Sequence, residues 1–359
     1  MRPHPTVNPW AVHEPVVHFG GRMIVRRDQA PLGRTLPYRR AGGEHPIRTG
    51  GADLARHHGW EVDLGAGGLG DMLLGLALVR ALIDATGRDD LEYVGPRPDL
   101  LRRGSLPLHA RYMTGPNLVR TGDPNPLPFL AVPEKPPAWL DLLDDMNVEV
   151  HAALPMRYYL AAERTLGVRL PASHAPAPSF SSTQAAQPFH VVFVSATSWP
   201  DRKDYGAAGF SDIAKTLAQR CSAPWRFTLI TGMDTPSVSV ATDVLTGPTA
   251  ADCLNVFASA EVVIGNDTGL THLAALTQRP DGTSPQVIGL YGRHAHTKWT
   301  TGADHHHAIA TPFAQMLAAA DRCPVRDRLD DTLWSASASL TDIPAELIAN
   351  VAAHVAGWW

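Results

Sequence analysis

The sequence predicts an α/β fold built from two domains. Short apolar segments of strand length alternate with segments of helical length, and a stretch at 172–188 rich in Pro, Ser and Ala interrupts this alternation. Repeated strand–helix–strand order is typical of a parallel sheet with helices on its faces. A chain of 359 residues can bury two cores of ordinary size. We therefore expect two Rossmann-like βαβ domains that face each other across a cleft, with 172–188 as the linker.

The first domain is expected at residues 59–171, after an N-terminal extension at 1–58 that is rich in Pro, Gly and Arg. Within the extension, residues 16–25 are hairpin-like, with Gly20-Gly21 at the turn. The apolar run at 72–85 is fourteen residues long, which favours a buried helix over a strand. The segments expected in the domain are a strand at 60–64, this helix, which ends at Gly87, a strand at 91–94 and a helix at 156–167.

The second domain is expected at residues 189–340 and repeats the alternation, and 341–359 closes the chain as an amphipathic helix. Because the carboxyl ends of the strands in both domains would border the cleft, ligands are expected to bind there. The segments predicted in this domain are strands at 190–194, 227–230, 262–264 and 286–291, and helices at 210–220, at 250–258 and from 272 onward.

Charge and composition exclude several classes of protein. The net charge of −4 is the sum of +5 in residues 1–58, −4 in 59–171 and −5 in 172–359, so no large basic face for nucleic acid is expected outside the extension. No apolar run is long enough to span a membrane, and the N-terminus lacks the apolar core of a signal peptide. Three cysteines far apart in the chain give neither a disulfide framework nor zinc-ligand spacing. We therefore expect a cytoplasmic protein.

The first motif that carries chemistry runs from Gly65 to Asp71 (GAGGLGD), between a strand and a helix. Glycines permit tight turns and close approach of a ligand, and the helix amides that follow favour an anion. A G-x-G-x-x-G pattern alone is a weak sign of a dinucleotide fold, and no acidic residue follows at the spacing expected for a ribose. Asp71 is either a helix-capping carboxylate or a catalytic one.

The second motif, at 263–275 (VIGNDTGLTHLAA), is the most specific in the chain. A strand ends in Asn-Asp-Thr-Gly and a helix begins at once, so polar groups converge where α/β proteins bind ligands. Asp267 can accept two ribose hydroxyls, and Thr268, Gly269 and the amides after them can hold a pyrophosphate. The alternative is an ordinary turn and cap, with His272 as a packed helix residue.

The third motif follows a strand at 195–205 (SATSWPDRKDY). Small hydroxyl residues suit phosphate oxygens, and a lysine can neutralise a leaving diphosphate. The chain contains 27 Arg and only 4 Lys, so Lys203 in this loop is notable. Its alternative is a solvated surface lysine.

The sequence gives no sign of a metal site, a serine-hydrolase elbow or a P-loop. Adjacent histidines at 305–307 do not usually form one metal site, and no cluster of carboxylates or cysteines accompanies them. The acidic pairs at 89–90, 144–145 and 330–331 do not give a D-x-D motif after a strand. Neither a G-x-S-x-G elbow nor a P-loop is present.

From Trp60 to the C-terminus, the sequence resembles glycosyltransferase family 9, the ADP-heptose:lipopolysaccharide heptosyltransferases. The residues that carry the resemblance are 68–71 (GLGD) before a long apolar helix and 265–275 (GNDTGLTHLAA), with 245–249 (LTGPT) and 289–292 (GLYG) in support. The resemblance implies a GT-B fold and an inverting transfer from an ADP-sugar, ADP-heptose above all, without a metal or another cofactor.

The resemblance also assigns roles to residues. It implies that Asp71 is the general base and that Thr197, Ser198 and Lys203 contact the donor diphosphate, although Trp199-Pro200 is an insertion relative to the family. Asp267 then binds the ribose. Residues 292–294 (GRH) replace the family's Gly-Pro-Thr-Asp, which leaves recognition of the donor sugar open. The remaining residues expected at the donor are Gly68, Gly70, Met233, Thr268, Gly269 and His272, with Asp234 as an alternative to Met233 beside the adenine.

The acceptor is the least determined part of this interpretation. A lipopolysaccharide core is strongly anionic, whereas residues 59–171 carry a net charge of −4, which favours a soluble acceptor such as a secondary metabolite. The Arg-rich extension keeps an anionic acceptor as an alternative. A GT-B sugar-nucleotide epimerase and a non-catalytic nucleotide-sugar binder are further alternatives, distinguished by turnover without an acceptor and by indifference to loss of Asp71.

Overall fold

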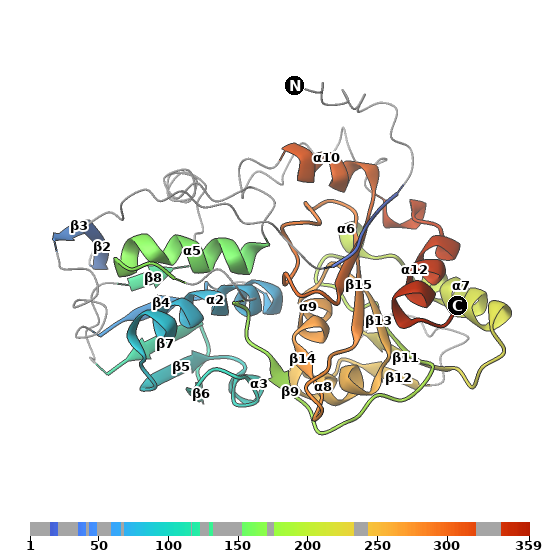
Figure 1. Ribbon diagram of the computed structural model, residues 1–359, viewed down its shortest axis with the longest axis horizontal. Coiled ribbons are helices and arrows are strands. Elements are labelled where there is room, and N and C mark those ends of the chain that lie inside the picture. The colour runs from blue at the N-terminus through green and yellow to red at the C-terminus, as the bar shows by residue number, and fades with distance from the viewer. Residues whose placement is uncertain are drawn as a thin grey trace.

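The structure is a computed structural model of the chain, in which two α/β domains lie side by side (Figure 1). It describes residues 15–20, 35–40, 43–48, 59–65, 68–115, 117–122, 129–131, 153–170, 176–232, 243–320 and 339–359.

The second domain contains a seven-stranded sheet in the order β1-β16-β15-β13-β10-β11-β12. From β12 to β16 every pairing is parallel, and the order is the 3-2-1-4-5-6 order of a Rossmann sheet. Continuous apolar segments form its central strands because helices cover both faces. The strands are β10 (His190–Val194), β11 (Arg226–Thr231), β12 (Asp243–Thr246), β13 (Val262–Asn266), β15 (Gln286–Tyr291) and β16 (His306–Ala310).

The helices of this domain follow the strands as expected. Thr249 caps α8 through a capping box with Asp252, which fixes where that helix begins. Within the segment 341–359, where a helix was expected, residues 345–356 form α12, which packs against α7. The helices are α6 (Pro200–Lys203), α7 (Ala207–Arg220), α8 (Ala250–Ser259), α9 (Gly269–Ala275), α10 (Pro312–Ala320) and α12 (Ala345–Ala356), with a 3₁₀ turn, η2 (Leu340–Asp342).

The first domain contains a five-stranded sheet in the order β6-β5-β7-β4-β8. This sheet is mixed rather than parallel throughout, because β7 lies between β4 and β5 and runs antiparallel to both. The strands β4 and β5 still point the same way, so the predicted strand–helix–strand unit exists with one strand inserted in it. The strands are β4 (Glu61–Asp63), β5 (Leu91–Gly95), β6 (Leu108–Tyr112), β7 (Leu118–Thr121) and β8 (Phe129–Ala131).

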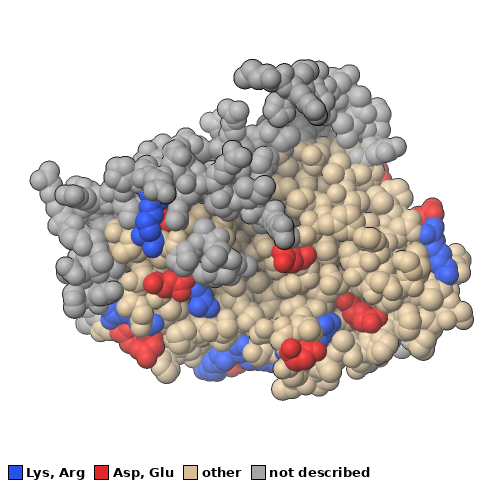
Figure 2. All heavy atoms as spheres, viewed as in Figure 1, with Lys and Arg blue, Asp and Glu red and all other residues tan. Residues whose placement is uncertain are grey.

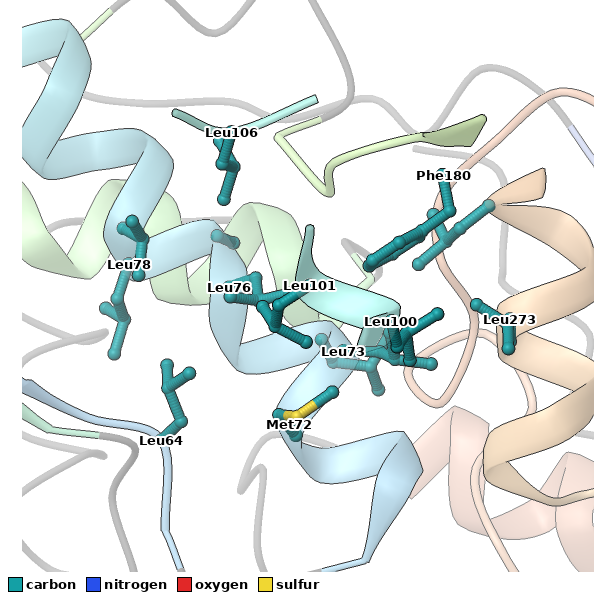
Figure 3. Close-up of a cluster of buried hydrophobic side chains, with 14 of the residues drawn as sticks. Leu64, Met72, Leu73, Leu76, Leu78, Leu100, Leu101, Leu106, Phe180 and Leu273 are labelled. Atoms are coloured by element: carbon teal, nitrogen blue, oxygen red, sulfur yellow. The ribbon is translucent and has the colours of Figure 1, made fainter. Parts of the chain in front are cut away.

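Two long helices, α2 (Leu69–Thr86) and α5 (Leu154–Leu166), pack against each other in the first domain, which also contains the short helix α3 (Pro98–Leu101). The helix α2 begins three residues earlier than expected and ends at Gly87 in the left-handed conformation, with φ of 70°. Its apolar side chains join a core that continues into the second domain (Figure 3). In that view, Met72 and Leu73 of α2 lie near Leu100 of α3, with Phe180 of the segment between the domains and Leu273 of the second domain beyond them.

The segment between the domains is more than a flexible linker. Within the expected linker at 172–188, β9 (Phe180–Ser181) pairs with β14 (Thr277–Gln278), and Phe180 is fully buried. On the side of the first domain, the Arg103 guanidinium donates to the Ala251 carbonyl and to Asn255, both on α8 and both at 3.0 Å. The domains are therefore joined by packing and by hydrogen bonds beside the covalent connection.

The described parts of the extension contact both domains. The strand β1 (Val16–His18) pairs antiparallel with β16 at the edge of the second domain's sheet, and Figure 1 shows it beside the orange strands of that sheet. The strands β2 (Thr35–Arg40) and β3 (Gly43–Arg48) form a hairpin, with β2 near α5. Of the hairpin expected at 16–25, the second half lies outside the described residues.

On the face shown in Figure 2, basic and acidic side chains are interspersed and do not gather into a patch of one sign. Among the described residues, no helix has the length and apolarity needed to cross a membrane.

Candidate functional site

The loops after β10 and β13 are neighbours because the two strands pair where the order of the sheet reverses. Ligands of open α/β sheets bind outside the carboxyl ends of the strands at such a position. Asn266, fully buried at the end of β13, joins the two loops. Its amide donates to the Ser195 carbonyl and to the Asp204 carboxylate, both at 3.0 Å, and its oxygen accepts from the Tyr205 amide at 2.9 Å.

Asp267, which follows β13, is the centre of a cluster of charged and titratable side chains. The Lys203 ammonium lies 2.9 Å and the His294 Nδ1 lies 2.8 Å from the same oxygen, Oδ2. The His272 Nε2 lies 3.9 Å from the other oxygen, Oδ1. Only 4% of Asp267 is exposed, so these contacts replace most of its hydration. The interpretation of Lys203 as a solvated surface lysine is therefore wrong.

The charges in this cluster follow from burial and pairing. Burial alone would raise the pKa of Asp267, but the Lys203 ammonium and the hydrogen bond from His294 outweigh it and hold that pKa well below its usual range. Burial lowers the pKa of His272 to about 4, against the attraction of Asp267. Near neutral pH, the cluster therefore contains an ionised Asp267 and a neutral His272.

The first turns of α2 and α9 touch across the boundary between the domains. A Cβ atom on Gly269 would lie 2.5 Å from the Gly70 nitrogen and 2.7 Å from the Leu69 Cβ. A Cβ atom on Gly70 would lie 3.0 Å from the His272 Cδ2. Glycine at 269 therefore permits a backbone-to-backbone approach that a larger residue would prevent.

This contact places Asp71 beside the Asp267 cluster. The Asp71 Oδ2 accepts from the Gly68 amide at 3.0 Å, so its capping role is present in the structure. Burial raises the pKa of Asp71, while the Gly68 amide and the positive charge of Lys203 lower it and the charge of Asp267 raises it. A carboxylate that is partly desolvated and has a raised pKa is suited to accept a proton.

The other residues expected at the site have different positions. Thr197 and Ser198 lie in the loop after β10, where the Thr197 hydroxyl accepts from the Trp199 amide at 3.2 Å and Ser198 is exposed. Thr268 caps α9, its hydroxyl accepting from the Leu270 amide at 3.2 Å. Met233 and its alternative Asp234 lie outside the described residues.

Three residues of the site had no role assigned to them from the sequence. His294 contacts Asp267 directly, and Asn266 holds the loop that carries Lys203. Tyr158 of α5 is 5% exposed and close enough to Asp71 for the charge of that carboxylate to raise its pKa further, after the larger effect of burial. The substitution of 292–294 relative to the family was the only sequence signal for His294.

The histidines at 305–307 are structural. His306 and His307 belong to β16, and the ring nitrogens of His305 and His307 hydrogen-bond to the Ala275 carbonyl at 2.7 Å and to the Gln286 side chain at 2.8 Å. Within the described part of the chain, no group of three or more His, Cys, Asp or Glu side chains is arranged to hold a metal ion.

The chain is similar in sequence and in structure to known glycosyltransferases. A sequence model of glycosyltransferase family 9 (heptosyltransferase) matches residues 147–324. The ADP-heptose lps heptosyltransferase II of E. coli has a similar structure, at 13% sequence identity and a TM-score of 0.53 over 83% of this chain and 98% of that one. The iron-containing dodecameric glycosyltransferase TibC from enterotoxigenic E. coli H10407 aligns at 14% identity and a TM-score of 0.49, over 88% of this chain and 78% of that one. No curated protein sequence gives a significant match.

The two α/β domains and the site between them define a protein of the GT-B fold. The predicted resemblance to glycosyltransferase family 9 is confirmed. The family match contains the Lys203–Asp267 pair and not Asp71, so it covers a shorter part of the chain than the resemblance had indicated.

Proposed function

We propose that the protein is an inverting glycosyltransferase that transfers heptose from ADP-heptose to a hydroxyl or amine of an acceptor. The observation that carries this proposal is the position of Asp71 beside the Lys203–Asp267 pair, across the contact between α2 and α9. The family match and the similarity to a heptosyltransferase structure support heptose as the sugar.

In this mechanism, the residues divide into a donor side and an acceptor side. Asp267 accepts the ribose hydroxyls of ADP, and Lys203 faces the diphosphate together with Thr197, Ser198, Thr268 and Gly269. Lys203 neutralises the negative charge that grows on the diphosphate as it leaves. A preorganised cation in a partly desolvated site strengthens this effect.

Asp71 acts on the other face of the sugar. Its carboxylate accepts the proton of the acceptor hydroxyl while that oxygen forms a bond to the anomeric carbon. The bond from that carbon to the diphosphate oxygen breaks at the same time, and ADP leaves with the electron pair. Attack opposite the leaving group inverts the anomeric configuration. These groups suffice for the displacement, so the proposal needs no metal ion.

We further propose a soluble, weakly charged acceptor, because residues 59–171 carry a net charge of −4. A phosphorylated lipopolysaccharide core is the alternative acceptor. Cys221 and Cys253 are free thiols, which supports the cytoplasm as the compartment.

The test is calorimetric titration with ADP, UDP, GDP and CDP without added metal, followed by an acceptor screen with ADP-heptose. The screen compares neutral small molecules with phosphorylated core sugars, and NMR of the product gives the anomeric configuration. We expect ADP to bind best, Asp267→Ala to abolish binding, and Asp71→Ala to retain binding while abolishing turnover. A preference for another nucleotide would exclude ADP-heptose, conversion of donor without an acceptor would indicate an epimerase, and full turnover by Asp71→Ala would exclude Asp71 as the base.

A further inference from the structure

His294 and Lys203 both contact the same carboxylate oxygen of Asp267. Both contacts, at 2.8 Å and 2.9 Å, are to Oδ2. Lys203 has a flexible stem and is the cation that faces the diphosphate in the proposed function. When its ammonium turns toward a diphosphate, the contact with Asp267 weakens or is lost.

Without Lys203, Asp267 would depend on the ribose hydroxyls and on its remaining protein donors. A carboxylate with 4% exposure is unfavourable when no donor or cation compensates for its lost hydration. His272 does not supply a positive charge, because burial keeps its pKa near 4, and its Nε2 is 3.9 Å from Oδ1. His294 is the described side chain that already donates to Oδ2 within hydrogen-bond distance.

The surroundings of His294 hold its ring in place. The imidazole packs edge-on against the Trp299 ring, with 5.7 Å between the centroids. The Trp299 carbonyl in turn accepts from the Tyr291 hydroxyl at 2.7 Å, which ties this loop to the end of β15. With 16% of its side chain exposed, His294 lies at the border of the site rather than in solvent.

We propose that His294 is a positioning residue of the donor site, which holds the Asp267 carboxylate in the orientation that binds the nucleotide when Lys203 turns to the diphosphate. The nucleotide in this statement rests on the proposed function, whereas the contact with Asp267 does not.

The variants His294→Asn and His294→Leu separate positioning from packing. Asparagine can place an amide donor near the position of Nδ1, whereas leucine fills space without donating. Because a hydrogen bond to a charged group contributes about 1.5–3 kcal/mol, we expect His294→Leu to weaken ADP binding by at least about tenfold. We expect His294→Asn to bind ADP within about threefold of the unmodified protein. Equal affinity in all three proteins, or equal weakening in both variants, would overturn the proposal.

A second measurement tests the contact without a nucleotide. In ¹⁵N NMR of the nucleotide-free protein, the proposal requires a proton on the Nδ1 of His294, with a changed signal in Asp267→Asn. A neutral ring protonated at Nε2 alone would overturn it. If the unmodified protein binds no ADP, the proposed function fails, and this NMR result still decides whether His294 holds Asp267.

Discussion

The contact between Gly269 and Gly70 can be tested by adding one methyl group. In Gly269→Ala, the new Cβ would lie 2.5 Å from the Gly70 nitrogen and 2.7 Å from the Leu69 Cβ, whereas ordinary contacts begin at 3.4 Å. The first turns of α2 and α9 must therefore separate by about 1 Å. Alanine is a better helix former than glycine, so a loss of function cannot be attributed to a weakened α9.

This separation moves Asp71 away from the Asp267 cluster without changing either carboxylate. A misplacement of about 1 Å can lower a rate by about 100-fold, equivalent to about 2.7 kcal/mol in the barrier. We expect kcat to fall by about that factor, and by more than ADP affinity falls. The assay is ADP release from ADP-heptose with an acceptor found in the screen, beside calorimetric titration of ADP.

The matched control is Gly68→Ala in the same turn. The nearest atom to its new Cβ is the Asp71 Oδ2 at 3.8 Å, and φ at Gly68 is −66°, so the change causes no clash. Its effect on kcat should be much smaller than that of Gly269→Ala. A Gly269→Ala enzyme within about twofold of the original rate would refute the argument that this approach brings the two halves of the site together.

Three further predictions follow from the site and the sheet edge. Because Asp71 acts as a base and burial raises its pKa above the ordinary value, kcat should fall as the pH decreases through that raised pKa. Lys203→Met removes a positive charge that lowers the pKa of Asp71, so it should shift this fall in kcat to higher pH. Asp267→Asn should weaken ADP binding by at least about tenfold in calorimetry, since it replaces the charged acceptor of the ribose hydroxyls with a neutral amide. Gly20→Ala should lower the melting temperature in calorimetry, because its Cβ would lie 2.4 Å from the Asp304 carbonyl oxygen; an unchanged melting temperature would mean that this segment is not held to β16.

Much of the fold could be predicted because the central strands are locally distinctive. The strands β10, β13 and β15 can be recognised in the sequence as continuous apolar segments, because strands covered on both faces need apolar side chains throughout. The strands that were missed are shorter or carry polar residues. The strand β6 has an intermediate or exposed residue at four of its five positions, and β16 begins with two histidines that resemble a loop in the sequence. The pairing of β1 with β16 is non-local and leaves no periodic signal.

In the candidate site too, the residues marked by a local sequence pattern could be predicted and those that depend on long-range packing could not. Asp71 and Asp267 could be predicted because each lies where a strand gives way to a helix, a local arrangement that the sequence displays. His294 could not, because its importance depends on its distance to Asp267, 27 positions earlier in the chain. The direct pairing of Lys203 with Asp267 also depends on the packing of two loops.

The position of β1 means that the first domain is inserted into the second. Residues 16–18 belong to the sheet that is otherwise built from residues 190–310, so each end of the first domain leads into the same neighbouring unit. A fragment cut at the linker would separate β16 from its partner and leave a row of unpaired backbone groups at that sheet edge. Such an edge invites pairing with other chains. An independently expressed second domain would therefore need residues 16–20 supplied on the same or another polypeptide.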